Sequence, residues 1–195
     1  LPNDDCQNAI EIANRGLING NLMCANATGT ATCGFSNGNP DLWYRFTAPP
    51  PGGLLVLDTC GSRDMGGSNA GADPVLSVYS GCPGTENNQL ACNDDGFAAG
   101  CNTLDSRLTI QLAPCQSILI RVSHFGVDPI NIGNGGFWLR ANLQSCIRGD
   151  SNCDGLINNF DIDCFVRALS GGQNAWNAAC FNPPNCGYLC SNDVN

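Results

Sequence analysis

Lysine is absent from the sequence, and histidine and glutamate are nearly so. The 195 residues include one histidine, His124, and two glutamates. Without lysine, the chain can form neither a Schiff base nor an isopeptide bond between lysine and asparagine. A single histidine excludes a metal centre built from several imidazoles. Eight arginines against 17 acidic residues leave a net charge of -9, so we expect no basic surface for nucleic-acid phosphates.

Long apolar runs and catalytic constellations are lacking as well. The longest apolar run, residues 53–57, is far shorter than the roughly 20 residues that span a bilayer, so no membrane insertion is expected. Ser123 and His124 are neighbours in an alternating segment, where their side chains point to opposite faces and form no nucleophile–base pair. Glu11 and Glu86 lie in segments predicted as edge or loop. We therefore predict that the chain is not an enzyme.

Cysteine, by contrast, is abundant. The 14 cysteines are spread along the whole chain, and the paired C-x2-C spacings of zinc sites are missing. This pattern is typical of disulfide-stapled proteins, so we expect a secreted protein, extracellular or at the cell surface. Cys82 and Cys92 flank a predicted hairpin loop and form the first candidate pair; Cys60 and Cys101 form the second. The spacing leaves the other connections open.

Between residues 40 and 144 the sequence consists of short runs that alternate between apolar and polar residues. Loops rich in Gly, Asn and Asp separate these runs. A period of two over so many short segments predicts a mainly β fold, an antiparallel β-sandwich. The predicted strands lie at 42–47, 54–57, 75–79, 108–112, 118–123 and 137–143.

The pattern changes after Leu143. Ile162, Phe165, Val166 and Leu169 share one face of a predicted helix over residues 161–169, and Ser170-Gly171-Gly172 would end it. We place a domain boundary near residues 145–149. The predicted domains are a disulfide-stapled sandwich at 1–145 and a calcium-binding module at 146–195.

Residues 150–161 match the calcium-loop pattern D-x-[DN]-x-[DN]-G with a carboxylate at position twelve. Calcium takes six to eight oxygen ligands, and Gly155 stands where the loop bends sharply. We therefore predict bound Ca²⁺. The predicted ligands are Asp150, Asn152, Asp154, the carbonyl of Leu156, Asn158 and Asp161.

The run NCDGLINNFDIDCFVRAL resembles the dockerin type I calcium repeat, as found at the ends of secreted planctomycete-type proteins. The resemblance rests on Asp161 in place of glutamate and on the absence of a predicted helix before the loop. Dockerins carry two such loops. Asp193 and Asn195 are similar to the first and third positions of a second metal loop, so we expect this loop to be truncated and the chain to be a fragment.

The front domain resembles the bacterial pre-peptidase C-terminal-like (PPC-like) domains. The resemblance rests on N-D-D-C-x-N-A-I at 3–10, D-L-W-Y-R-F-T-A-P at 41–49, D-P-V-L-S-V-Y-S-G-C at 73–82 and A-C-N-D-D at 91–95. It implies a jelly-roll-like sandwich that serves as a binding or spacer module, and some relatives bind calcium or collagen.

A further calcium site is suggested by Asn93-Asp94-Asp95, together with Asp58 or Asp73. Turns also favour aspartate without any metal, so both interpretations stay open.

Two classes of function follow. The first is a non-catalytic, extracellular, calcium-binding structural or adhesive protein, assembling with copies of itself or another extracellular protein. The second is a module that binds carbohydrate (a polysaccharide) or a cohesin-like partner, cut from a larger secreted hydrolase. Sugar sites use exposed aromatic side chains, and the tryptophans are Trp43, Trp138 and Trp176. Exposure of Trp43 and Trp138 on one sheet face would favour sugar binding; their burial would favour a structural role.

Overall fold

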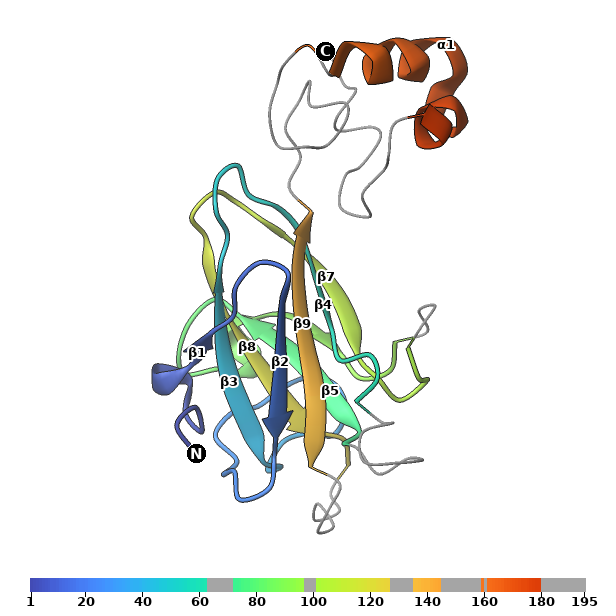
Figure 1. Cartoon of the computed structure of the whole chain (residues 1–195). Coiled ribbons are helices and arrows are strands. Elements are labelled where there is room, and N and C mark those ends of the chain that lie inside the picture. The colour runs from blue at the N-terminus through green and yellow to red at the C-terminus, as the bar shows by residue number, and fades with distance from the viewer. Residues whose placement is uncertain (63–71, 97–100, 127–134, 145–158, 160, 180–195) are drawn as a thin grey trace.

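The computed structural model describes residues 1–62, 72–96, 101–126, 135–144, 159 and 161–179, and its fold is mainly β (Figure 1). The described strands are β1 (Ile10–Glu11), β2 (Gly16–Asn21), β3 (Asp41–Thr47), β4 (Gly53–Asp58), β5 (Pro74–Tyr79), β6 (Gln89–Asn93), β7 (Arg107–Leu112), β8 (Ser117–His124) and β9 (Gly136–Gln144). Two short 3-10 helices, η1 (Cys6–Asn8) and η2 (Glu86–Asn88), and one α-helix, α1 (Asp161–Ala179), complete the list.

The strands form two sheets. Sheet A has the order β1-β3-β8-β5-β6, and sheet B has the order β2-β9-β4-β7. Every pair is antiparallel except β1 with β3. The prediction of a mainly β fold is therefore confirmed, with two sheets that share a common core.

The core lies between the sheets and follows the predicted alternation. Along β9, buried residues alternate with half-buried ones from Gly136 to Gln144. Tyr44 of sheet A packs edge-on against Phe137 of sheet B, with ring centroids 6.3 Å apart. Such a contact adds about 1 kcal/mol to the stabilisation from burial alone. These inward residues form one cluster drawn from both sheets.

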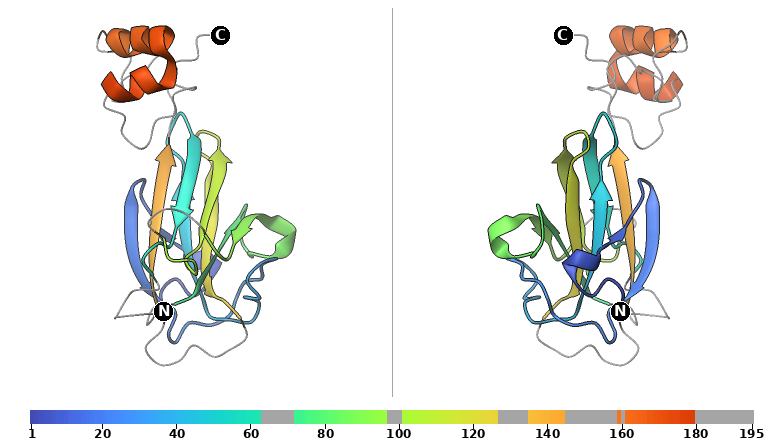
Figure 2. Two further views of the ribbon diagram at one scale, coloured as in Figure 1. Left: turned by 90° about the vertical axis from the view of Figure 1, so that its right-hand side faces the viewer. Right: turned by 90° about the vertical axis from the view of Figure 1, so that its left-hand side faces the viewer.

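Sheet A is also buried on its outer face, which the alternation does not predict. Residues 26–39, here called the cover segment, cross this face, and the β5–β6 connection lies beside them (Figure 2). The Thr30 N–H donates to the Gly84 carbonyl at 3.1 Å. Beneath them a second buried cluster contains Trp43, Tyr79 and Leu119 together with Cys6. The part of the outer face of sheet A that carries Trp43, Tyr79 and Leu119 is therefore an interior surface.

Three disulfides join described residues: Cys6–Cys82, Cys33–Cys92 and Cys60–Cys101. The third is the predicted pair. The predicted Cys82–Cys92 bridge is wrong, because the β5–β6 register places Cys92 opposite Ser77, five positions before Cys82.

The tail prediction is met only in part. Helix α1 begins at Asp161, but it runs to Ala179 through a kink at Gly172, where φ is 64°. On the predicted apolar face, Ile162, Val166 and Leu169 are exposed. Residues 150–158, Asp193 and Asn195 lie outside the described part of the chain, as does the predicted domain boundary. Within the part described, we find no helix that is long and apolar enough to cross a membrane.

Candidate functional site

A buried ion pair lies under the cover segment. Asp41 begins β3, and Arg121 of β8 stands opposite Trp43 in the β3–β8 register. Arg121 Nε donates to Asp41 Oδ2 at 2.7 Å, and both side chains are 0% exposed. Because a buried charge is costly unless its partners satisfy it, the surrounding contacts decide whether this pair stabilises the fold.

The Asp41 carboxylate has four further donors. These are the Thr28 N–H at 3.1 Å, the Thr28 hydroxyl at 2.7 Å, the Gly29 N–H at 2.9 Å and Trp43 Nε1 at 2.9 Å. Arg121 also donates to the Ser36 hydroxyl at 3.1 Å and to the Ser36 carbonyl at 2.8 Å. The pair thus binds both halves of the cover segment to sheet A. It is a positioning network that holds the loop.

Three carboxylates meet at one end of the described sandwich. Oxygens of Asp73, Asp94 and Asp95 lie within 4.8 Å of one another. One oxygen of Asp94, Oδ1, is buried without a hydrogen-bond partner. Burial, and then the negative charge of Asp95, raises the pKa of Asp94 to about 6. Converging carboxylate oxygens suit a hard cation such as calcium.

This grouping distinguishes Asp73 from Asp58, which the sequence left as alternative ligands for the further calcium site. Asp73 joins Asp94 and Asp95, whereas Asp58 accepts a hydrogen bond from Arg140 Nη1 at 3.0 Å. The neighbouring Asn93 instead accepts the Arg107 N–H with its side chain. Of the residues predicted for the further calcium site, the structure therefore brings together Asp73, Asp94 and Asp95.

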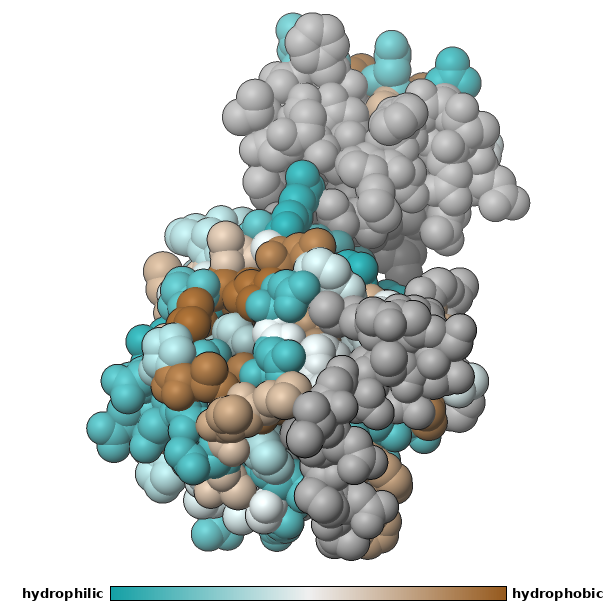
Figure 3. Space-filling model, turned by 60° about the horizontal axis from the view of Figure 1, so that its bottom comes forward, coloured by the Kyte–Doolittle hydropathy of each residue, from teal (hydrophilic) through white to brown (hydrophobic). Residues whose placement is uncertain are grey.

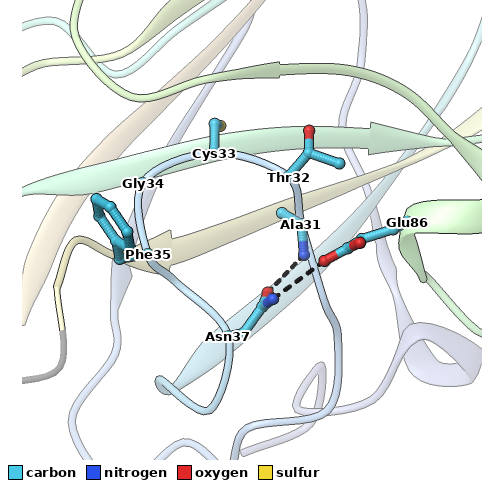
Figure 4. A pocket seen from close by; sticks show the side chains of 7 residues that line it. All are labelled: Ala31, Thr32, Cys33, Gly34, Phe35, Asn37 and Glu86. Atoms are coloured by element: carbon cyan, nitrogen blue, oxygen red, sulfur yellow. Dashed lines mark hydrogen bonds between the residues drawn. The ribbon is translucent and has the colours of Figure 1, made fainter.

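A pocket of about 530 Å³ opens on the cover segment. Phe35 and Glu86 lie on opposite sides of it, with Asn37 between them (Figure 4). The Asn37 side-chain oxygen accepts the Ala31 N–H at 2.7 Å, and its amide donates to Glu86 Oε1 at 3.1 Å. A pocket of this size falls in the range of small-ligand sites.

Phe35 is the most exposed large apolar side chain of the described residues, at 79%. On the face drawn in Figure 3, hydrophobic residues form separate patches among hydrophilic ones. Sequence reasoning considered only tryptophans as exposed aromatics and missed Phe35. The available signal was a lone aromatic residue among the turn-forming residues Gly34, Ser36 and Gly38.

The tryptophans do not form a shared platform. Trp43 is fully buried on the outer side of sheet A, and Trp138 is half-buried on sheet B. The side chain of Trp176 lies outside the described set. Of the two tryptophans in the criterion set from the sequence, Trp43 is buried, as a structural role would require, and Trp138 meets neither condition.

Ser123 and His124 are consecutive residues of β8. The Ser123 hydroxyl donates at 3.0 Å to the carbonyl of Pro40, the residue that follows the cover segment. Side chains of consecutive strand residues point to opposite faces of the sheet.

No family model matches the sequence, and no curated protein matches it either. Solved structures show weak likenesses. The pre-peptidase C-terminal domain of a Bacillus anthracis collagenase is 12% identical, covers 69% of this chain and 92% of its own, and has a TM-score of 0.38. A surface-associated copper-binding protein of Methylomicrobium album, CorA, is 8% identical over 69% of this chain and 97% of its own, with a TM-score of 0.36. The K3 adhesin domain of Lys-gingipain from Porphyromonas gingivalis is 20% identical over 54% and 63%, with a TM-score of 0.26.

Proposed function

We propose that this chain is a non-catalytic extracellular module with a structural or adhesive role. The observation that carries the proposal is the position of two disulfides. Cys6–Cys82 and Cys33–Cys92 join the N-terminal segment and the cover segment to the β5–β6 hairpin, outside the main core. Each bridge closes a long loop and contributes about 4 kcal/mol in the chain-entropy account. The two bridges therefore stabilise segments outside the main core, as a long-lived protein exposed outside the cell requires.

Calcium belongs to the same proposal. The dockerin-like loop at 150–161 would hold one ion, and Asp73, Asp94 and Asp95 would hold another. An ion that binds only the folded chain stabilises it by about 1.4 kcal/mol for each tenfold excess of its concentration over Kd. Calcium would also remove the electrostatic repulsion among the three carboxylates.

The assembly state of the native chain tests the structural role. We expect self-association that grows with protein concentration in calcium and is reversed by a chelator, measured by sedimentation velocity. A monomer that ignores both calcium and chelator would contradict assembly. Calorimetric calcium titration of the double variant Asp150→Asn/Asp161→Asn, beside Asp94→Asn, separates the two ion sites.

A recognition role is the second candidate. It is favoured by one observation, the exposed Phe35 beside a pocket lined by polar groups. The ligand classes considered from the sequence are a polysaccharide and a cohesin-like protein partner. The hydrogen-bonding groups and the charge of the pocket determine which class of ligand it would bind.

A further inference from the structure

The pocket of Figure 4 has one charged side chain, Glu86, and several of the N–H donors around it are engaged within the protein. The Ala31 N–H and the Asn37 amide donate within the pocket, to Asn37 and Glu86 respectively. The Thr32 N–H donates to Gln89 Oε1 at 2.9 Å. The Glu86 carboxylate accepts at both oxygens and donates at neither. A ligand that donates to the Glu86 carboxylate therefore complements this pocket.

The charges near the pocket also favour a ligand that donates hydrogen bonds and carries a positive charge. Residues 22–40 and 80–96 contain no arginine, lysine or histidine, whereas the second segment carries Glu86, Asp94 and Asp95. Arg121, which lies beneath the cover segment, is paired with Asp41, and Arg140 is paired with Asp58. An anionic ligand would be repelled here, and a cation would be attracted.

The aromatic side of the pocket is held in place before any ligand arrives. Phe35 packs edge-on against Phe125, with ring centroids 6.3 Å apart. The Gly126 N–H donates to the Gly34 carbonyl at 3.1 Å, and the Cys33–Cys92 bridge holds the preceding residue. An exposed ring that is already ordered costs little entropy on binding. The face of an aromatic ring attracts cations.

We propose that this pocket binds an arginine side chain of an extracellular partner protein. A guanidinium is planar, carries five N–H donors and no acceptor, stacks on aromatic rings and pairs with carboxylates. The guanidinium would donate to Glu86, and the arginine side chain would lie against Phe35 across the pocket. A neutral sugar hydroxyl can also donate to Glu86, but it gains no ion pair with that carboxylate. The proposal adds a partner chemistry to the adhesive role and rests on that role only in making the partner extracellular.

The test is a titration of the full chain with a short fluorescent arginine peptide, followed by anisotropy. The matched probe carries citrulline, which keeps the shape of arginine and lacks its charge. We expect the citrulline peptide and the variant Glu86→Gln each to bind about tenfold more weakly. Phe35→Leu should weaken binding by about threefold. Glu11→Gln makes the same charge change elsewhere and should leave binding unchanged.

Three outcomes would overturn the proposal. The first is an arginine peptide that does not bind or binds no better than citrulline. The second is equal weakening by Glu86→Gln and Glu11→Gln, which would indicate diffuse attraction to an acidic surface. The third is a neutral soluble xylan oligosaccharide that binds at Phe35 more tightly than the arginine peptide does. All three are read from peptide or sugar affinity, so they are distinguishable from a failed assembly test. Thermal unfolding of each variant verifies that it is folded.

Discussion

Asp41→Asn removes the negative charge beside Arg121 and keeps nearly the same side-chain volume. Arg121 stays charged and is 0% exposed, so its guanidinium would be left inside without a counter-ion. An asparagine oxygen also accepts fewer hydrogen bonds than the five that the Asp41 carboxylate accepts. Breaking a buried pair in this way costs about 3–5 kcal/mol. This is a large part of the roughly 5–15 kcal/mol that stabilises a typical fold.

The assay is equilibrium urea unfolding with the disulfides intact, followed by tryptophan fluorescence and circular dichroism. With a slope of about 2 kcal/mol per molar urea, the unfolding midpoint should fall by about 2 M. Coincidence of the two signals would support a two-state comparison. Adding Arg121→Met to Asp41→Asn should recover part of the loss, because no uncompensated charge remains.

Asp58→Asn is the matched control. The Asp58–Arg140 pair has the same chemistry at 3.0 Å, but the two side chains are 17% and 42% exposed respectively. A pair this accessible to solvent contributes at most about 1 kcal/mol. If Asp41→Asn and Asp58→Asn shifted the midpoint equally, the buried network would not be what holds the cover segment.

Three further predictions concern other parts of the sandwich. With chelator present, Asp94→Asn should become progressively more stable than the wild type as the pH rises from about 4 to about 6. The raised pKa of Asp94 means that its carboxyl ionises in the unfolded state before it ionises in the folded state, so the wild type loses stability over this pH range. Urea midpoints at several pH values measure this difference. Gly84→Ala should cost about 1–3 kcal/mol in thermal or urea unfolding, since a Cβ there would overlap the ring of Trp43. Of the described cysteines, Cys24 and Cys115 are unbridged and exposed, so both should react with maleimide in the native, unreduced protein, as mass spectrometry of peptides would detect.

Each of these predictions has a control or a contrary outcome. Gly81→Ala should be nearly neutral, because nothing lies within 4 Å of a Cβ at that position. Saturating calcium should remove the pH dependence of the Asp94→Asn difference if the ion binds there, since calcium favours the ionised carboxylate. Modification of Cys33 or Cys92 without reductant would contradict the described disulfide pairing.

The sheets were predictable from sequence because alternation records which side chains meet the core. Leu42, Tyr44 and Phe46 were read correctly as one face of a strand, and they pack in the core. The other face of sheet A was not predictable. Trp43 and Arg121 alternate outward and would be read as exposed, yet both are buried. The cover segment that buries them has no periodic pattern, so the local sequence does not indicate which surface it covers.

The candidate sites were predictable only where ligand type alone was decisive. Asp94 and Asp95 were identified as carboxylates of a turn, but the choice of Asp73 over Asp58 depends on strand pairing across sheet A. The Cys82–Cys92 prediction failed for a similar reason: proximity in sequence was taken for proximity in space. Phe35 was missed because exposure of a single loop side chain has no periodic signature.

The crossed bonds of the N-terminal half have a consequence for damage. Cys6 is joined to Cys82, Cys33 to Cys92 and Cys60 to Cys101. Any single backbone nick between residues 7 and 100 falls inside at least one of these covalent rings. The two pieces of a nicked molecule would stay covalently joined, and a measurement of molecular mass would show separate fragments only after a reductant was added.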